Sequence, residues 1–147
     1  MTSYALDLYR QMLLSIKRGS HNGCKSIAKP IFLISLIDVL PFMQKNLFEV
    51  NNPKLIEVYK VNMMQYGQNS KTPMSLPYFH LHSETFYNII WKDPERTIKL
   101  AHSPSSKVLS EYTSGANLDE ELWELLQDEG NRVYLRKCII ETFLTKD

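Results

Sequence analysis

The chain has 147 residues, with 17 Lys and Arg against 16 Asp and Glu, and a formal net charge of +1. Its 44% apolar and 22% charged residues are typical of one compact domain and exclude a disordered chain. The longest nearly apolar run, 30–43, is interrupted by Ser35 and Asp38 and is shorter than the roughly 18 to 20 residues that cross a bilayer. We therefore expect no transmembrane helix and no membrane partner.

The N-terminal residues and the cysteines both indicate a cytoplasmic protein. The first residues lack the basic region, apolar region and small-residue cleavage site of a secretory signal. Cys24 and Cys138 lie far apart, form no CxxC motif and cannot build a zinc site alone, so we expect reduced thiols.

The near-zero net charge conceals an asymmetry along the chain. Residues 1–110 carry a net charge of +6, and residues 111–147 carry −5. Residues 1–29 alone contain five basic side chains and one acidic side chain. This end could present a positive potential to a polyanion, although a solvated helix face has the same composition.

The first elements are two helices joined by a polar loop. Apolar residues at three- and four-residue spacing predict an amphipathic helix over 3–18 that stops at Gly19. The loop 19–26 contains small turn residues with His21 and Lys25, two side chains suited to phosphate. From Pro30 onward the sequence predicts a helix that is apolar on most sides, which we interpret as the central core helix.

The middle of the chain predicts a further helix and a hairpin. A short strand is expected at 47–50, and Asn52 with Pro53 begins a helix that Gly67 ends. Two aromatic-rich runs, 76–81 and 86–91, predict a β-hairpin.

The C-terminal third predicts helices. Ser105 or Ser106 caps a short helix through Tyr112, and 117–120 resembles a capping box that begins the next helix. An amphipathic helix with apolar residues from Val133 to Phe143 closes the chain. The fold class expected for residues 1–147 is a single α+β domain, mostly helical, with a small antiparallel β-hairpin and a winged-helix-like layout.

A metal-dependent enzyme is one alternative that the residues leave open. His80, His82 and Glu84 alternate along the predicted strand and could share one face as metal ligands, or simply form a polar strand face. No GxSxG, P-loop or GxGxxG motif is present, and the histidines do not suit a His-Asn-His nuclease. We therefore expect no catalytic residue, no cofactor and no bound metal.

Three segments together resemble one known family, the DNA sulfur-binding domains of bacterial type IV His-Asn-His restriction endonucleases. The run 28–38 (AKPIFLISLID) resembles the family's basic-Pro-aliphatic helix, and 76–87 (LPYFHLHSETFY) resembles its Tyr-Pro-Phe-x-x-Leu hairpin with the aromatic pair that follows. The segment 118–126 (LDEELWELL), with Arg132 and 135–143, is similar to its C-terminal half. The order and spacing agree from roughly residue 5 to residue 144.

The resemblance implies binding of duplex DNA in which sulfur replaces one non-bridging phosphate oxygen. Sulfur is larger and more weakly hydrated than oxygen, so an apolar pocket gains from burying sulfur and is penalised for desolvating oxygen. One such atom supports a discrimination of roughly 1–3 kcal/mol. The remaining affinity comes from phosphate contacts, which depend on salt and not on sequence.

The resemblance also implies a sulfur pocket, and at this pocket the sequence departs from the family pattern. Lys29 falls where the family has a basic residue beside the sulfur, usually Arg, and Leu76, Pro77 and His80 fall on the pocket wall. Leu76 replaces the usual Tyr, and His80 replaces a small residue. Leucine keeps the wall apolar, whereas lysine keeps the charge without the bidentate fork.

Loops that we expect near this pocket supply further candidate DNA contacts. These are His21, Lys25 and Ser26, then Gln68, Asn69 and Lys71, then His102, Ser105, Ser106 and Lys107. Family members usually continue into a nuclease domain, whereas this chain stops at Asp147. We therefore expect a non-catalytic domain that is either an isolated binding domain or one that leaves cleavage to a nuclease domain or subunit as its partner. A winged-helix module for ordinary DNA and a protein-interaction domain with the acidic 111–129 segment remain alternatives.

Overall fold

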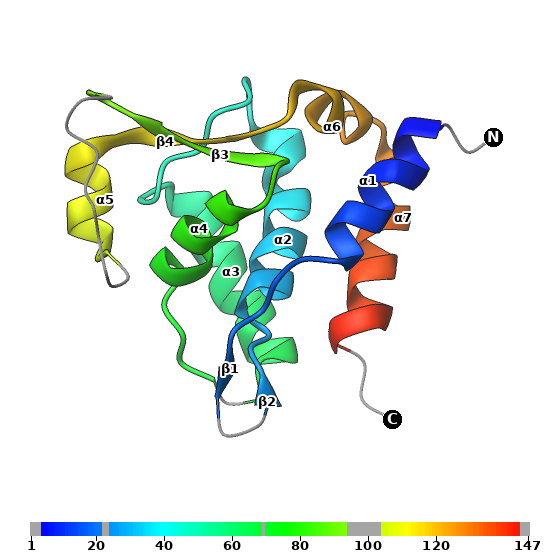
Figure 1. Ribbon diagram of the computed structural model, residues 1–147, viewed down its shortest axis with the longest axis horizontal. Coiled ribbons are helices and arrows are strands. Elements are labelled where there is room, and N and C mark those ends of the chain that lie inside the picture. Colours follow the sequence, from blue (N-terminus) through cyan, green and yellow to red (C-terminus); the bar gives the residue numbers. More distant parts are fainter. Residues whose placement is uncertain (1–3, 22–23, 69, 94–103, 145–147) are drawn as a thin grey trace.

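Helix α2 (Ala28–Val39) forms the centre of the molecule, as a computed structural model of residues 4–21, 24–68, 70–93 and 104–144 shows (Figure 1). Ten of its twelve residues are buried, and it packs against α3, α4 and α7. The helices around it are α1 (Tyr4–Leu14), α3 (Pro53–Tyr66), α4 (Ser75–His80), α5 (Ser106–Tyr112), α6 (Glu120–Leu125) and α7 (Glu129–Ile139). The predicted central core helix is confirmed, although it begins two residues before Pro30.

Five aromatic rings from separate segments pack together in the core. Phe32 of α2 lies 6.1 to 6.5 Å, between ring centroids, from Phe48, Tyr59, Tyr78 and Tyr87. The buried hydroxyl groups are satisfied, since Tyr78 donates to the Phe48 carbonyl and Tyr87 to the Tyr78 carbonyl. These contacts fix α4 and the strand that follows it against α2.

Two small antiparallel sheets complete the fold. Strands β1 (Ser20–His21) and β2 (Cys24–Lys25) form a hairpin before α2. Strands β3 (Tyr87–Trp91) and β4 (Thr113–Leu118) pair at the opposite end of the molecule (Figure 1). The strand predicted at 47–50 is reduced to one bridge, in which Phe48 pairs with Ala116.

The hairpin predicted over 76–91 is wrong in its first half. Residues 75–80 form α4, Leu81–Ser83 form a 3₁₀ turn, and β3 pairs with β4 instead. Tyr78 and Phe79 are both buried, and a strand would direct two neighbouring side chains to opposite faces. A helical turn buries both against one core. The predicted α+β class, mostly helical with a small antiparallel sheet, is nevertheless confirmed.

Two of the predicted helix starts are confirmed, and a third is wrong. Asn52 caps α3 by accepting from the Leu55 amide at 3.1 Å, and Ser105 caps α5 by accepting from the Val108 amide at 3.2 Å, as expected. The predicted capping box is wrong, because 117–118 belong to β4 and Asp119 precedes α6.

The apolar pattern predicted for the last helix is correct only in part. Val133 is 61% exposed, whereas α7 buries Ile139, which belongs to that pattern, and Leu135, which does not. Within the described ranges, no helix is long and apolar enough to cross a membrane, and this includes the apolar α2.

Candidate nucleic-acid interface

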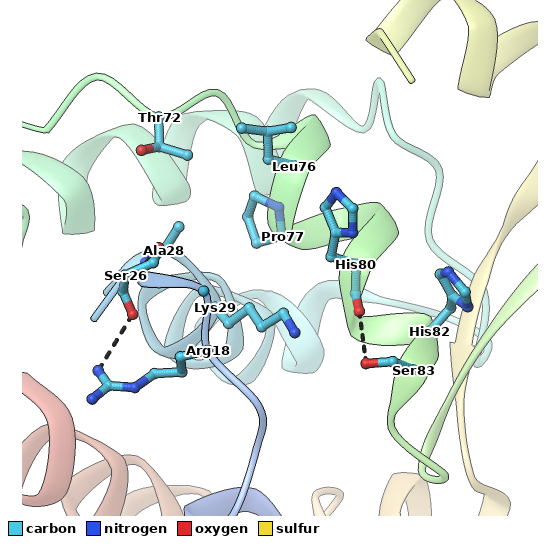
Figure 2. A pocket seen from close by; sticks show the side chains of 11 residues that line it. Arg18, Ser26, Ala28, Lys29, Thr72, Leu76, Pro77, His80, His82 and Ser83 are labelled. Atoms are coloured by element: carbon cyan, nitrogen blue, oxygen red, sulfur yellow. Dashed lines mark hydrogen bonds between the residues drawn. The ribbon is translucent and has the colours of Figure 1, made fainter. Parts of the chain in front are cut away.

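A hollow of about 410 Å³ opens between the first turn of α2, helix α4 and the segment that follows α1 (Figure 2). We call it the α2–α4 pocket. Its lining combines basic, apolar and hydroxyl-bearing residues, namely Arg18, Gly19, Ser26, Ala28, Lys29, Thr72, Leu76, Pro77, His80, His82 and Ser83.

All four residues that the resemblance assigned to a sulfur pocket line this hollow. Lys29 comes from the first turn of α2, whereas Leu76, Pro77 and His80 come from α4. Figure 2 shows the Lys29 side chain between Arg18 on one side and Pro77 and His80 on the other. The fold therefore brings together two segments that are far apart in the sequence.

The Lys29 ammonium group is held by the main chain of the segment after α1. Its Nζ donates to the Lys17 carbonyl at 2.7 Å, and the Lys17 amide donates to the Glu84 carboxylate at 2.9 Å. Burial lowers the pKa of Lys29, the Glu84 charge opposes this shift, and Lys17 adds to it. The Lys17 peptide is thus fastened on both sides, which positions the next residue, Arg18.

Arg18 also lines the pocket, although it is not among the site residues predicted from the sequence. Its guanidinium donates to the Ser26 carbonyl at 3.3 Å and lies 4.7 Å from the centroid of the Phe143 ring. Partial burial lowers the pKa of Arg18. The basic end of the first helix was visible in the sequence, but its distance from α4 was not.

His80 contributes an imidazole at the exposed side of the pocket. Burial lowers the pKa of His80, and the charges of Lys29 and His82 lower it further, so its neutral form is favoured. Its ring packs on Phe79 with centroids 5.3 Å apart. His80 can therefore donate one hydrogen bond to an anion without adding a fixed charge.

The residues predicted as DNA contacts in the loops do not all lie at the α2–α4 pocket. Ser26 lines the α2–α4 pocket, whereas Lys71 and Ser106 line a different hollow beside α3. Gln68 and Lys107 are exposed, and Ser105 is occupied as the cap of α5. His21 and Lys25 lie in β1 and β2. Asn69 and His102 lie outside the described residues.

The predicted strand face of His80, His82 and Glu84 does not exist. His80 ends α4, His82 lies in the 3₁₀ turn, and Glu84 follows that turn. In the part of the chain that the structure describes, no group of three His, Cys, Asp or Glu residues is arranged to hold a metal ion. The alternating pattern that suggested a metal trio depended on the incorrect strand.

No protein-family model matches the chain, and no curated protein matches it in sequence. The sulfur-binding domain of ScoMcrA complexed with phosphorothioated DNA is similar in structure, with a TM-score of 0.68 and 12% identity over 97% of this chain and 88% of that chain. The sulfur-binding domain of SprMcrA, also complexed with phosphorothioated DNA, has a TM-score of 0.64 and 13% identity over 99% of this chain and 90% of that one.

A third solved structure shows the same fold inside a longer protein. The type IV phosphorothioation-dependent restriction endonuclease ScoMcrA has a TM-score of 0.66 and 12% identity over 97% of this chain, which corresponds to 30% of the endonuclease. The chain therefore has the fold of the sulfur-binding domains of these proteins over nearly its whole described length.

Proposed function

We propose that this chain is a non-catalytic domain that binds duplex DNA and prefers a backbone with a phosphorothioate linkage. The observation that carries the proposal is the α2–α4 pocket, where Lys29 meets the apolar wall of Leu76 and Pro77. The similarity in fold to domains complexed with phosphorothioated DNA supports the same function. Such a domain would act on DNA in the cytoplasm, together with a nuclease domain or subunit.

The pocket suits an anion that carries apolar surface. A phosphate oxygen needs strong hydrogen bonds to replace its water, and the wall of Leu76 and Pro77 offers none. Sulfur loses less hydration there and gains dispersion contacts. Lys29 supplies the positive charge. Its ammonium group has three N–H donors, and one of them donates to the Lys17 carbonyl.

The remaining contacts would carry the affinity that does not depend on sulfur. In this proposal Arg18 and Ser26 meet the modified linkage, and His21, Lys25, Gln68, Asn69, Lys71, His102, Ser105, Ser106 and Lys107 meet neighbouring phosphates and bases.

The decisive experiment compares two otherwise identical duplexes, one with a single Rp phosphorothioate and one with ordinary phosphate. Fluorescence anisotropy at several salt concentrations gives both Kd values and their salt slopes. We expect tighter binding of the sulfur duplex by about tenfold, with similar slopes for the two duplexes. Equal affinities would leave a general DNA-binding module, and no binding to either duplex would contradict the proposal altogether.

A charge-matched pair of variants locates the site. Lys29→Ala is expected to weaken binding of both duplexes and to reduce the salt slope by about one charge. Lys45→Ala removes an equal charge from the segment beyond the other end of α2, so it should leave both Kd values nearly unchanged. If the two variants behave alike, the α2–α4 pocket is not the binding site.

A further inference from the structure

A second hollow, of about 470 Å³, lies beside α3 and is separate from the pocket already described. We call it the α3 pocket. Its floor and walls are mainly apolar, formed by Val50, Ile56, Tyr59, Met63, Met64 and Met74. Lys60, Lys71 and Ser106 also line it. Lys71 and Ser106 are also two of the DNA contacts predicted from the sequence.

The two pockets are neighbours that share one wall. Thr72 lines both of them. The Tyr59 hydroxyl donates to the Thr72 carbonyl at 2.9 Å, and the Thr72 hydroxyl lies 2.9 Å from that of Ser70. Because Tyr59 is almost fully buried in the core, these bonds hold the wall in place. The two pockets therefore adjoin at Thr72.

The α3 pocket, like the α2–α4 pocket, combines apolar walls with basic side chains. Met63, Met64 and Met74 bring three polarizable thioethers, and Met64 is 87% exposed. Lys60 and Lys71 bring two exposed ammonium groups, and none of the described residues that line the pocket carries a carboxylate. Apolar, polarizable walls beside lysines favour an anion whose surface is itself apolar and polarizable.

The shape of a duplex decides which part of it such a hollow can receive. The sugar-phosphate backbones protrude, whereas base edges lie at the floor of the grooves. An ordinary phosphate would lose hydration against methionine side chains with little return, but a sulfur-bearing linkage would not. We therefore propose that the α3 pocket is a second site for a phosphorothioate linkage of the same duplex. This inference rests on the proposed function of the α2–α4 pocket.

The methionine methyl groups report on the α3 pocket alone. The chain has six methionines; three line this pocket, and no described methionine lines the α2–α4 pocket. With ¹³C-methyl methionine, we expect diethyl thiophosphate to shift the signals of Met63, Met64 and Met74 at lower concentration than diethyl phosphate does. Met12 and Met43 serve as internal controls outside the pocket. Equal responses to the two anions, or no selective shift, would overturn the inference.

A second test uses DNA with two sulfur atoms. One sulfur stays fixed, and the other is moved through the positions of both strands within one helical turn. At the best position we expect the second sulfur to tighten binding by about tenfold, with one protein bound per duplex by sedimentation. If no position adds affinity, the inference is wrong.

Matched variants separate this inference from the proposed function. In Met64→Gln the gain from the second sulfur should fall by about threefold or more, whereas Leu8→Gln on α1 should retain it. Both side chains are exposed, so these changes should leave the fold intact. A preference for one sulfur without any gain from the second contradicts only this inference. Loss of the single-sulfur preference in the unaltered protein contradicts the proposed function.

Discussion

At the scale of single residues, the proposed function gives Leu76 and Lys29 different roles in the α2–α4 pocket. Leu76 forms part of the apolar wall, which would distinguish sulfur from oxygen but adds no charge. Lys29 would attract either kind of linkage, because the charge of the two linkages is the same. Sulfur preference and overall affinity should therefore respond to different substitutions.

Leu76→Asn tests this division. The amide would hydrogen-bond an oxygen and would remove apolar contact with sulfur, so the ratio of the two Kd values should fall by about fivefold to tenfold. Affinity for the ordinary duplex should change by less than about twofold. Leu8→Asn, a half-exposed leucine on α1, is the matched control. A ratio that stays constant in Leu76→Asn would exclude this wall from sulfur recognition.

His80 should make DNA binding depend on pH. Burial and the charges of Lys29 and His82 lower the pKa of His80 in the free protein, so its imidazole is neutral at pH 7. A bound anion favours the protonated form and raises this pKa, so binding takes up a proton. DNA affinity should therefore rise as the pH falls below about 7, by roughly threefold or more at pH 5.5.

The measurement is the Kd at several pH values and constant ionic strength. His80→Gln should flatten the profile, because the His80 imidazole lines the pocket and is the group that would take up the proton. A fall in pH should have the opposite effect on folding stability from its effect on DNA affinity. The unfolded chain binds the proton more readily, so stability should decrease as the pH falls through the ordinary histidine range.

At the scale of elements, the β3–β4 sheet determines where α4 lies. Tyr87 begins β3 and donates its hydroxyl to the Tyr78 carbonyl of α4, while Phe48 bridges β4 at Ala116. Gly115 of β4 makes this close approach possible. It has φ of +151°, and an added Cβ would lie 2.9 Å from the Phe48 carbonyl oxygen and 2.9 Å from Leu47 Cδ1.

Gly115→Ala should therefore destabilise the fold by about 2 kcal/mol or more, because both the backbone conformation and the space are unsuited to a side chain. Urea denaturation measures the loss. Gly19→Ala is the control, since nothing lies within 4 Å of the position its Cβ would take. Equal stability of the two variants would show that β4 can move away from Phe48.

At the scale of the whole molecule, a polar network connects α2, α3 and α7 at a distance from the α2–α4 pocket. Arg136 of α7 donates to the Asp38 carboxylate of α2 at 2.7 Å, and Asn62 of α3 donates to both Asp38 and the buried Ser35 at 3.0 Å. Lys29 lies at the other end of α2, nine residues from Asp38 and about 14 Å along the helix. Substitutions in this network should therefore lower stability without changing DNA affinity.

Arg136→Met tests this separation. It leaves Asp38 half-buried without its cation and should cost about 1–2 kcal/mol of stability, between the values for exposed and buried pairs. The Tm should fall, while the Kd for phosphorothioated DNA, measured well below the Tm, should stay the same. A parallel loss of affinity would mean that the network also controls the pocket.

Part of the fold and five of the eleven residues that line the α2–α4 pocket were predictable, and particular residues explain the rest. The unbroken apolar run identified α2, and the Asn52 and Ser105 caps located the start of two helices, because these signals are local. The aromatic run 76–81 has no such signal, and only its contacts with Phe32 and Phe48 decide that it is helical. The place of Arg18 in the pocket likewise depends on contacts with distant residues, which no local signal predicts.

The sequence by itself determined the fold class, the central helix and four residues of the proposed sulfur pocket. Periodicity and capping act within a few residues, and the resemblance to sulfur-binding domains depends on short segments. The tertiary structure alone decided that α4 is a helix, that β3 pairs with β4, that Arg18 joins Lys29, and that methionines and lysines form the α3 pocket. These features depend on contacts between distant segments, and such contacts arise only when the core packs.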